Sequence, residues 1–165
     1  MSLRISNANL DAIQKHALET YPNECCGIIV ERNGQEDVVR VTNLQNELHK
    51  KDPTQFRRTA KTAYTMGAEA APILLAAERG ELRLHAFYHS HPEHDAYFSE
   101  EDRTQAFGGW DEPNYPNAGQ IVISVYGREV KDIAAFLWDE EKRDFVRTEL
   151  SDPSDRSDPS DPTAS

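Results

Sequence analysis

Three of the six histidines fall within residues 87–102, "FYHSHPEHDAYFSEED", together with a serine and an aspartate. His89 and His91 stand two apart at the end of a predicted strand, where side chains at i and i+2 point to the same face. Two imidazoles on one face can converge on one ion, and Zn²⁺ binds neutral imidazole readily. A His-x-His pair is also common by chance, so the pair alone does not separate a metal site from a polar strand end.

Ser99 and Asp102 have two interpretations. "SEED" has a serine followed three residues later by an acid, which is typical of a helix N-cap with a negatively charged first turn. In the other interpretation Asp102 points back at the ion as a third ligand, and Ser99 presents its hydroxyl to a substrate. We expect that Asp102 cannot be a strong capping acceptor and a ligand at once. His94, in the loop between, is predicted to be solvent-exposed.

The other three histidines are expected to lie outside any site. His85 is predicted to be a packing residue of the strand, and His16 and His49 are predicted to lie on the surface. A metal site here would therefore depend on the complete spacing around residues 89–102.

That spacing is His89, one residue, His91, seven residues, Ser99, two residues, Asp102. It resembles the signature of the JAMM (MPN+, JAB-domain) zinc metallopeptidases, in which Pro92 is also usual. The family further requires an upstream glutamate in a segment that ends in Cys-Gly.

The segment "HALETYPNECCGIIVER" is similar to that second motif around Glu24, Cys26 and Gly27. Without it, Glu24 would be read as a charged residue in a turn. The two motifs lie about 65 residues apart in the order the family has, and the resemblance extends over most of residues 7–140. A compact chain without further domains looks more like the prokaryotic branch.

The resemblance implies a role for each of the five positions. His89, His91 and Asp102 would hold Zn²⁺ and leave a water as the fourth ligand, whose pKa falls to around 7. Glu24 would act as general base, and Ser99 would donate a hydrogen bond to the oxyanion of the tetrahedral intermediate. The implied reaction is hydrolysis of a peptide or isopeptide bond.

The resemblance also implies the substrate class. Family members commonly cut after the C-terminal glycines of ubiquitin-like or sulfur-carrier proteins, and some phage relatives assist tail assembly. We therefore expect a protein substrate with a C-terminal Gly-Gly. The identity of the modifier, an activating partner and the oligomeric state stay open.

Three alternatives come from other classes. A non-catalytic MPN scaffold would not need all four of Glu24, His89, His91 and Asp102. A zinc deaminase would need a Pro-Cys-x-x-Cys motif, which the sequence lacks. A cysteine hydrolase would use Cys25 or Cys26, which we instead expect to be packing residues of an apolar strand.

The composition argues against some classes of binding partner. The 165 residues carry a net charge of -11, which argues against nucleic acid and against anionic lipid, because both need clustered Lys and Arg. The same acidity suits a cytosolic enzyme or a halophilic source. The two cysteines are adjacent and cannot form a disulfide framework, and the N-terminus has no apolar run. We expect a cytoplasmic protein.

The elements that must position these residues follow from periodicity. We predict a helix over 7–22 capped by Ser6 or Asn7, a hairpin of "CCGIIVERNG" and "EDVVRVTNL", and an irregular stretch at 43–56. A helix over 59–79 kinked near Pro72, a strand "LRLHAFYHS", a helix over 99–106 and three C-terminal strands follow. This order predicts an α/β (α+β layered) domain over 1–150, a mixed sheet flanked by helices with the MPN/JAB, cytidine-deaminase-like fold. Residues 151–165, a Ser-Asp-Pro repeat, are predicted to be a disordered tail.

Overall fold

The computed structural model describes residues 2–154, which form one seven-stranded mixed sheet in the order β1-β7-β6-β5-β4-β2-β3. The strands are β1 (Ser2–Arg4), β2 (Cys26–Arg32), β3 (Gln35–Val41), β4 (Arg83–Pro92), β5 (Gly119–Tyr126), β6 (Glu129–Asp139) and β7 (Asp144–Ser151). The helices are α1 (Asn7–Thr20), α2 (Gln45–Lys51), α3 (Ala70–Glu78) and α4 (Glu100–Phe107). The pairs β1–β7 and β4–β5 are parallel and the other pairs are antiparallel, so the predicted mixed sheet with helices is confirmed.

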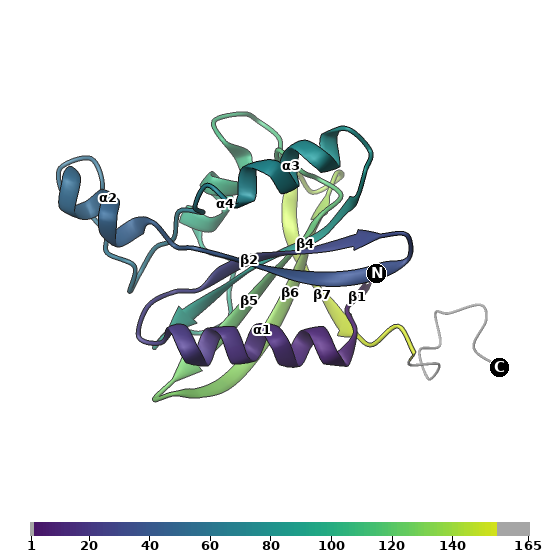
Figure 1. Ribbon diagram of the computed structural model, residues 1–165, viewed down its shortest axis with the longest axis horizontal. Helices are drawn as coiled ribbons and strands as arrows, with labels where there is room; N and C mark the ends of the chain where they lie inside the picture. Colours follow the sequence, from purple (N-terminus) through teal and green to yellow (C-terminus); the bar gives the residue numbers. More distant parts are fainter. Residues whose placement is uncertain (1, 155–165) are drawn as a thin grey trace.

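Helices lie on both sides of the sheet, whose central strands β2, β4 and β5 are the most buried (Figure 1). Helix α1 covers one face, and α3 and α4 lie on the other side. Strand β2 shows why the sequence there is continuously apolar: Cys25 and Ile29 join the cluster under α1, whereas Cys26 and Ile28 join the cluster that contains Ala70 of α3. A strand with two covered faces needs apolar side chains at every position rather than at alternate ones.

Most of the predicted elements are confirmed. Helix α1 begins after Ser6, whose Oγ accepts a hydrogen bond from the Asn9 backbone N–H at 3.2 Å. Strands β2 and β3 are joined at Asn33-Gly34, where both residues have positive φ, as a tight hairpin turn requires. Strand β4, helix α4 and the three C-terminal strands also lie where periodicity predicts them.

Two predictions about the segment between β3 and β4 are wrong. The stretch 43–56 is not irregular throughout, because α2 occupies its centre, and the helix predicted over 59–79 is confined to α3. Pro72 is the third residue of α3, within the first turn, where its missing N–H breaks no helical hydrogen bond. Pro72 therefore belongs to the start of a helix and does not kink one.

The expectation that His16 lies on the surface is also wrong. The side chain is buried under the sheet, and its Nδ1 lies 2.7 Å from the Tyr88 hydroxyl. Burial, followed by the nearby charge of Arg40, lowers the pKa of His16 to about 4, so the ring stays neutral. The Tyr88 ring lies against Gly27, its partner across the β2–β4 ladder.

Strand β7 ends one residue inside the predicted tail. Ser151 pairs with Arg4 of β1, and Asp152 accepts a hydrogen bond from the Asn7 backbone N–H at 2.7 Å. The rest of the predicted disordered segment, residues 155–165, lies outside the described residues. Within residues 2–154, none of the helices has the length and apolar character needed to cross a membrane.

Gly27→Ala should destabilise the protein by about 1–3 kcal/mol, because the packed core must shift to accept the added methyl. A Cβ at position 27 would lie 2.3 Å from atoms of the Tyr88 ring, far inside contact distance. Urea denaturation measures the loss. In a Tyr88→Leu background the same change should cost much less, and an equal cost in both backgrounds would contradict the assigned clash.

Candidate metal centre

The pairing of β2 with β4 brings the two sequence motifs together. Cys26 pairs with His89 in this antiparallel ladder, and beyond it the Ser90 N–H donates to the Cys25 carbonyl at 3.1 Å. Continuing the same register places Glu24 opposite His91. Two motifs far apart in the chain therefore meet at one end of the sheet.

Three buried side chains converge there. His89 Nε2 lies 3.1 Å from His91 Nε2 and 3.1 Å from Asp102 Oδ1, and His91 Nε2 lies 3.3 Å from Asp102 Oδ2. Their ligand atoms all lie within 4.8 Å of one another. An ion held tetrahedrally by bonds of about 2.0–2.1 Å separates its ligand atoms by about 3.3–3.4 Å, close to the spacing found here. Two imidazoles and a carboxylate, so spaced, fit a zinc ion.

The ring of His91 is oriented for metal binding. Its Nδ1 lies 2.9 Å from the backbone carbonyl of Asp95, which can only accept, so Nδ1 carries the proton and the Nε2 lone pair faces the other two donors. The ring of His89 is held differently. Its Nδ1 is buried without a hydrogen-bond partner among the described residues, and the ring stacks on Tyr64 at 4.7 Å. On its Nδ1 side the ring of His89 is held by packing against Tyr64, and on its Nε2 side by the contact with Asp102.

Asp102 is both a cap and a candidate ligand, which corrects the expectation that it could not be both. Its Oδ2 accepts from the Ser99 backbone N–H at 3.0 Å, and Ser99 Oγ accepts from the Asp102 N–H at 3.1 Å, a complete capping box on α4. The carboxylate has two oxygens, and Oδ1 faces His89 Nε2 without serving the cap. One side chain therefore starts the helix and supplies a donor atom.

Electrostatics favour a charged Asp102. Burial alone would raise the pKa of this carboxyl, but the neighbouring His89 and His91 and the Ser99 N–H together hold the pKa well below its usual range. For His91, burial lowers the pKa, but the hydrogen bonds to Asp102 and to the Asp95 carbonyl outweigh burial. The pKa of His91 therefore lies above its usual value. Zinc binds neutral imidazole and ionised carboxylate, so metal binding displaces any proton carried by the ligand atoms.

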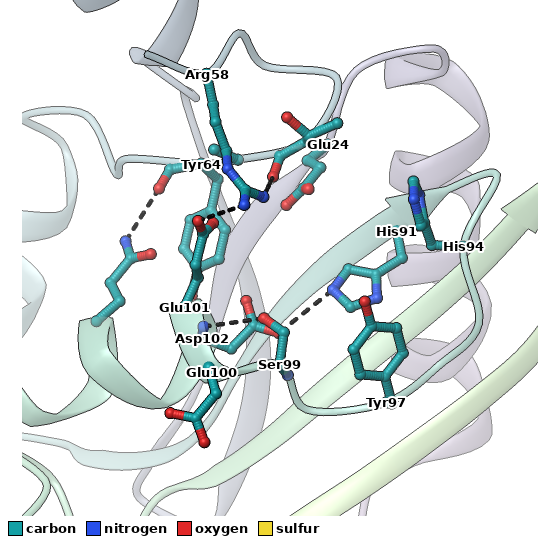
Figure 2. Close-up of a pocket in the computed structure, with 13 residues that line it drawn as sticks. Glu24, Arg58, Tyr64, His91, His94, Tyr97, Ser99, Glu100, Glu101 and Asp102 are labelled. Atoms are coloured by element: carbon teal, nitrogen blue, oxygen red, sulfur yellow. Dashed lines mark hydrogen bonds and ion pairs between the residues drawn. The ribbon is translucent and has the colours of Figure 1, made fainter. Parts of the chain in front are cut away.

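A cavity of about 310 Å³ opens in front of these donors. It is lined by Glu24, Arg58, Thr62, Ala63, Tyr64, His91, His94, Tyr97, Ser99, Glu100, Glu101, Asp102 and Gln105. Figure 2 shows Glu24 of the loop before β2, His91 of β4 and Asp102 of α4 around this one space. All five sequence-predicted site residues are thereby brought together, since His89 touches both His91 and Asp102.

Glu24 has the properties of a proton carrier. Its side chain is only 5% exposed, and no hydrogen bond joins its carboxyl group to another residue within 2–154. Burial raises the pKa of Glu24 to about 8; His91 opposes that rise and the charge of Asp102 adds to it. A carboxyl group with such a pKa can both take up and release a proton near neutrality.

Ser99 and His94 also line the cavity. Ser99 Oγ already accepts from the backbone of Asp102, which leaves its hydroxyl proton available to a substrate. His94 is exposed, as predicted, and its Nδ1 lies 2.9 Å from the Pro92 carbonyl rather than among the three donors.

Residues 52–69 contribute four lining residues that sequence patterns did not indicate, and two of them, Arg58 and Tyr64, make specific contacts. Arg58 reaches across the cavity to Glu101 of α4, with 2.7 Å between guanidinium and carboxylate (Figure 2). The Tyr64 ring stacks on His89. The segment is held by Asn43, whose Nδ2 donates to the carbonyls of Glu24 and Ala63. Such long-range contacts leave no local sequence signal.

Zinc-free protein should lose stability as pH rises from about 4.5 to about 8, because folded Glu24 keeps a proton that the unfolded chain has released. Glu24→Gln removes that difference. The variant should therefore gain stability over the wild type by about 2–4 kcal/mol between pH 5 and pH 8.5, since each tenfold change in proton affinity is worth about 1.4 kcal/mol. Urea denaturation at the two pH values measures this gain. Parallel pH profiles of the two proteins would contradict the assignment.

The chain resembles known proteins in sequence and in fold. A family model of prokaryotic homologues of the JAB domain matches residues 6–140. The tail tip assembly protein K of Escherichia phage N15 is 28% identical over 96 residues, which are 58% of this chain and 33% of that protein. The chain thus matches only a third of the length of this relative.

Two solution structures share the fold. A protein from Salinibacter ruber superimposes with a TM-score of 0.58 and 23% identity, covering 96% of this chain and 94% of that one. A protein from Desulfitobacterium hafniense superimposes with a TM-score of 0.61 and 20% identity, covering 91% of each chain. With a family model that spans most of the sheet and both motifs, the chain belongs to the prokaryotic JAB-domain family.

Proposed function

We propose that this JAB domain is a zinc-dependent metallopeptidase that hydrolyses a peptide or isopeptide bond. The observation that carries the proposal is Glu24: a buried carboxyl group, without a hydrogen-bond partner among the described residues, in the same cavity as three converging metal donors. A structural role would give this carboxyl a partner, because buried charges are normally paired. A catalytic base must instead keep its oxygens open to a water and a leaving group.

The residues divide the chemistry among them. His89, His91 and Asp102 would hold the zinc ion, which when bound supplies a Lewis acid and lowers the pKa of water to about 7. Glu24 accepts the proton of the attacking water on its carboxylate and passes it to the leaving amine. Ser99 donates its hydroxyl proton to the oxyanion that develops on the scissile carbonyl, an interaction typically worth about 3 kcal/mol.

We propose a ubiquitin-like or sulfur-carrier protein with a C-terminal Gly-Gly as the substrate, cut after its last glycine. The support is the likeness of both motifs to the JAMM peptidases. With a net charge of -11, nucleic acid and anionic membranes are not proposed as partners. Both cysteines are free and buried, which suits the reducing cytoplasm.

A second candidate is a peptidase of phage-type tail assembly. The similarity to the tail tip assembly protein K favours it, although only over 96 residues. A scaffold without catalysis is the third possibility, and zinc binding tests it first.

Purified protein should bind one zinc ion per chain, as measured by elemental analysis and chelator competition. His91→Ala should weaken zinc binding by at least about 100-fold, since even changes to residues behind the ligands cost 10–100-fold. His94→Ala is the matched control: it also lines the cavity but stands apart from the donors, and it should bind zinc like the wild type. Equal loss in both variants, or no zinc in the wild type, would favour the scaffold.

Glu24→Gln should keep zinc and lose about 10²–10⁴-fold in kcat/KM, the usual contribution of a general base. Ser99→Ala should lose about 10²–10³-fold. The assay is cleavage of fusions that carry ubiquitin-like or sulfur-carrier modifiers ending in Gly-Gly. A Cys25→Ala, Cys26→Ala double variant should retain activity, and activity that depends on these thiols while zinc stays bound would favour a cysteine hydrolase.

A further inference from the structure

A second, smaller cavity of about 170 Å³ lies beside the candidate metal centre. It is lined by Tyr64, Met66, Phe87, Gln105, Ala106, Pro113, Asn114, Tyr115 and Gln120. Tyr64 and Gln105 line both cavities, and Gln105 Nε2 donates to the Tyr64 carbonyl at 3.1 Å. This pair forms the partition between them, and the Tyr64 ring stacks on His89. A chain extended past the metal centre can therefore place a side chain in the second cavity.

The walls of the second cavity are neutral and partly aromatic. None of its nine lining residues carries a charge, in contrast to the acidic cavity beside it. The rings of Phe87 and Tyr115 lie 5.5 Å apart at 43° on one side of it. A cavity of about 150 Å³ with apolar walls accepts benzene in another protein, so this one has room for a six-membered ring.

Gln120 of β5 is the unusual residue of this cavity. The residue is only 6% exposed, and its carboxamide makes no hydrogen bond to another residue within 2–154. Gln45 offers the comparison, because it is equally buried and hydrogen-bonded at both ends: its Nε2 donates to the Arg58 carbonyl at 2.9 Å and its Oε1 accepts from Thr65 Oγ1 at 2.8 Å. Its polar atoms are not sealed in the core, since within residues 2–154 only His89 Nδ1 is a buried side-chain atom without a partner. The amide is therefore open to the cavity, where a ligand can engage its donor and its acceptor.

We propose that this cavity is a side-chain subsite that takes a neutral aromatic ring with a hydrogen-bonding tip, the chemistry of a phenol such as a tyrosine side chain. Its assignment as a substrate subsite rests on the proposed hydrolase function. The volume and aromatic walls of the cavity fit an aromatic ring, and its uncharged lining disfavours an ionised group. The carboxamide of Gln120 has a donor and an acceptor, which match a hydroxyl that both donates and accepts.

The first test uses p-cresol and toluene, which share ring and methyl and differ only in the hydroxyl. Titrations of zinc-free, full-length protein, followed by NMR, should show p-cresol binding about 5–10-fold tighter than toluene, the worth of one hydrogen bond. Gln120→Met replaces the amide by an apolar chain of similar shape and should remove that preference. Equal binding of the two probes by the wild type, or saturable binding of neither, would overturn the inference.

The second test compares two buried glutamines. Gln120→Met should leave the melting temperature within about 2 °C of the wild type, because the amide is open to the cavity and no protein group loses a partner. Gln45→Met should lower it, because it leaves the Arg58 carbonyl and the Thr65 hydroxyl without their partner. A fall in both variants would show that Gln120 has a structural role and would contradict a subsite.

Failure of this inference and failure of the proposed function are distinguishable. Probe binding and melting are measured without zinc and without cleavage, so an inactive protein can still show phenol selectivity. With an active protein, p-cresol should raise KM and leave kcat unchanged. If p-cresol lowers kcat alone, the cavity is not a substrate subsite, whereas the proposed hydrolase function is unaffected.

Discussion

The antiparallel pairing of β2 with β4 is the constraint on which the candidate centre depends. Ser90, between the two histidines, is fully buried on the opposite face, and its Oγ accepts from the Cys25 N–H at 2.8 Å while its own N–H donates to the Cys25 carbonyl. Because side chains alternate along a strand, the two histidines of His-Ser-His point to one face and Ser90 points to the other. The imidazoles approach each other and Asp102, and the serine binds Cys25, the residue that follows Glu24.

The same ladder ties the centre to the core under α1. Gly27 leaves space for the Tyr88 ring one residue before His89, and the Tyr88 hydroxyl reaches the buried His16. A side chain at position 27 would push the ring, and with it the strand that carries both imidazoles. Glycine there is a packing requirement of close approach, rather than of an unusual backbone conformation.

The residues that sequence reasoning could find are those whose signals are local. A capping serine, a hairpin turn at Asn33-Gly34 and the spacing of His89, His91 and Asp102 all lie within short windows, and the structure shows elements or clusters at each. Arg58 and Tyr64 could not be found this way, because their positions depend on Asn43 and on contacts between segments about 20 residues apart. Gln120 carried no signal at all, since an unpaired amide is visible only once its surroundings are known.

The opposing charges of the centre make the base and the metal site interdependent. In the metal-free protein Glu24 sits beside the carboxylate of Asp102 in a buried setting, and both effects favour its protonated form. A dication on the three donors would neutralise Asp102 and add positive charge, so it would lower the pKa of Glu24 toward that of an ordinary carboxylate. Occupied and empty centres therefore differ in the protonation of a residue that is not itself a ligand. In the proposed mechanism, Glu24 would therefore act as a base only in the zinc-loaded protein.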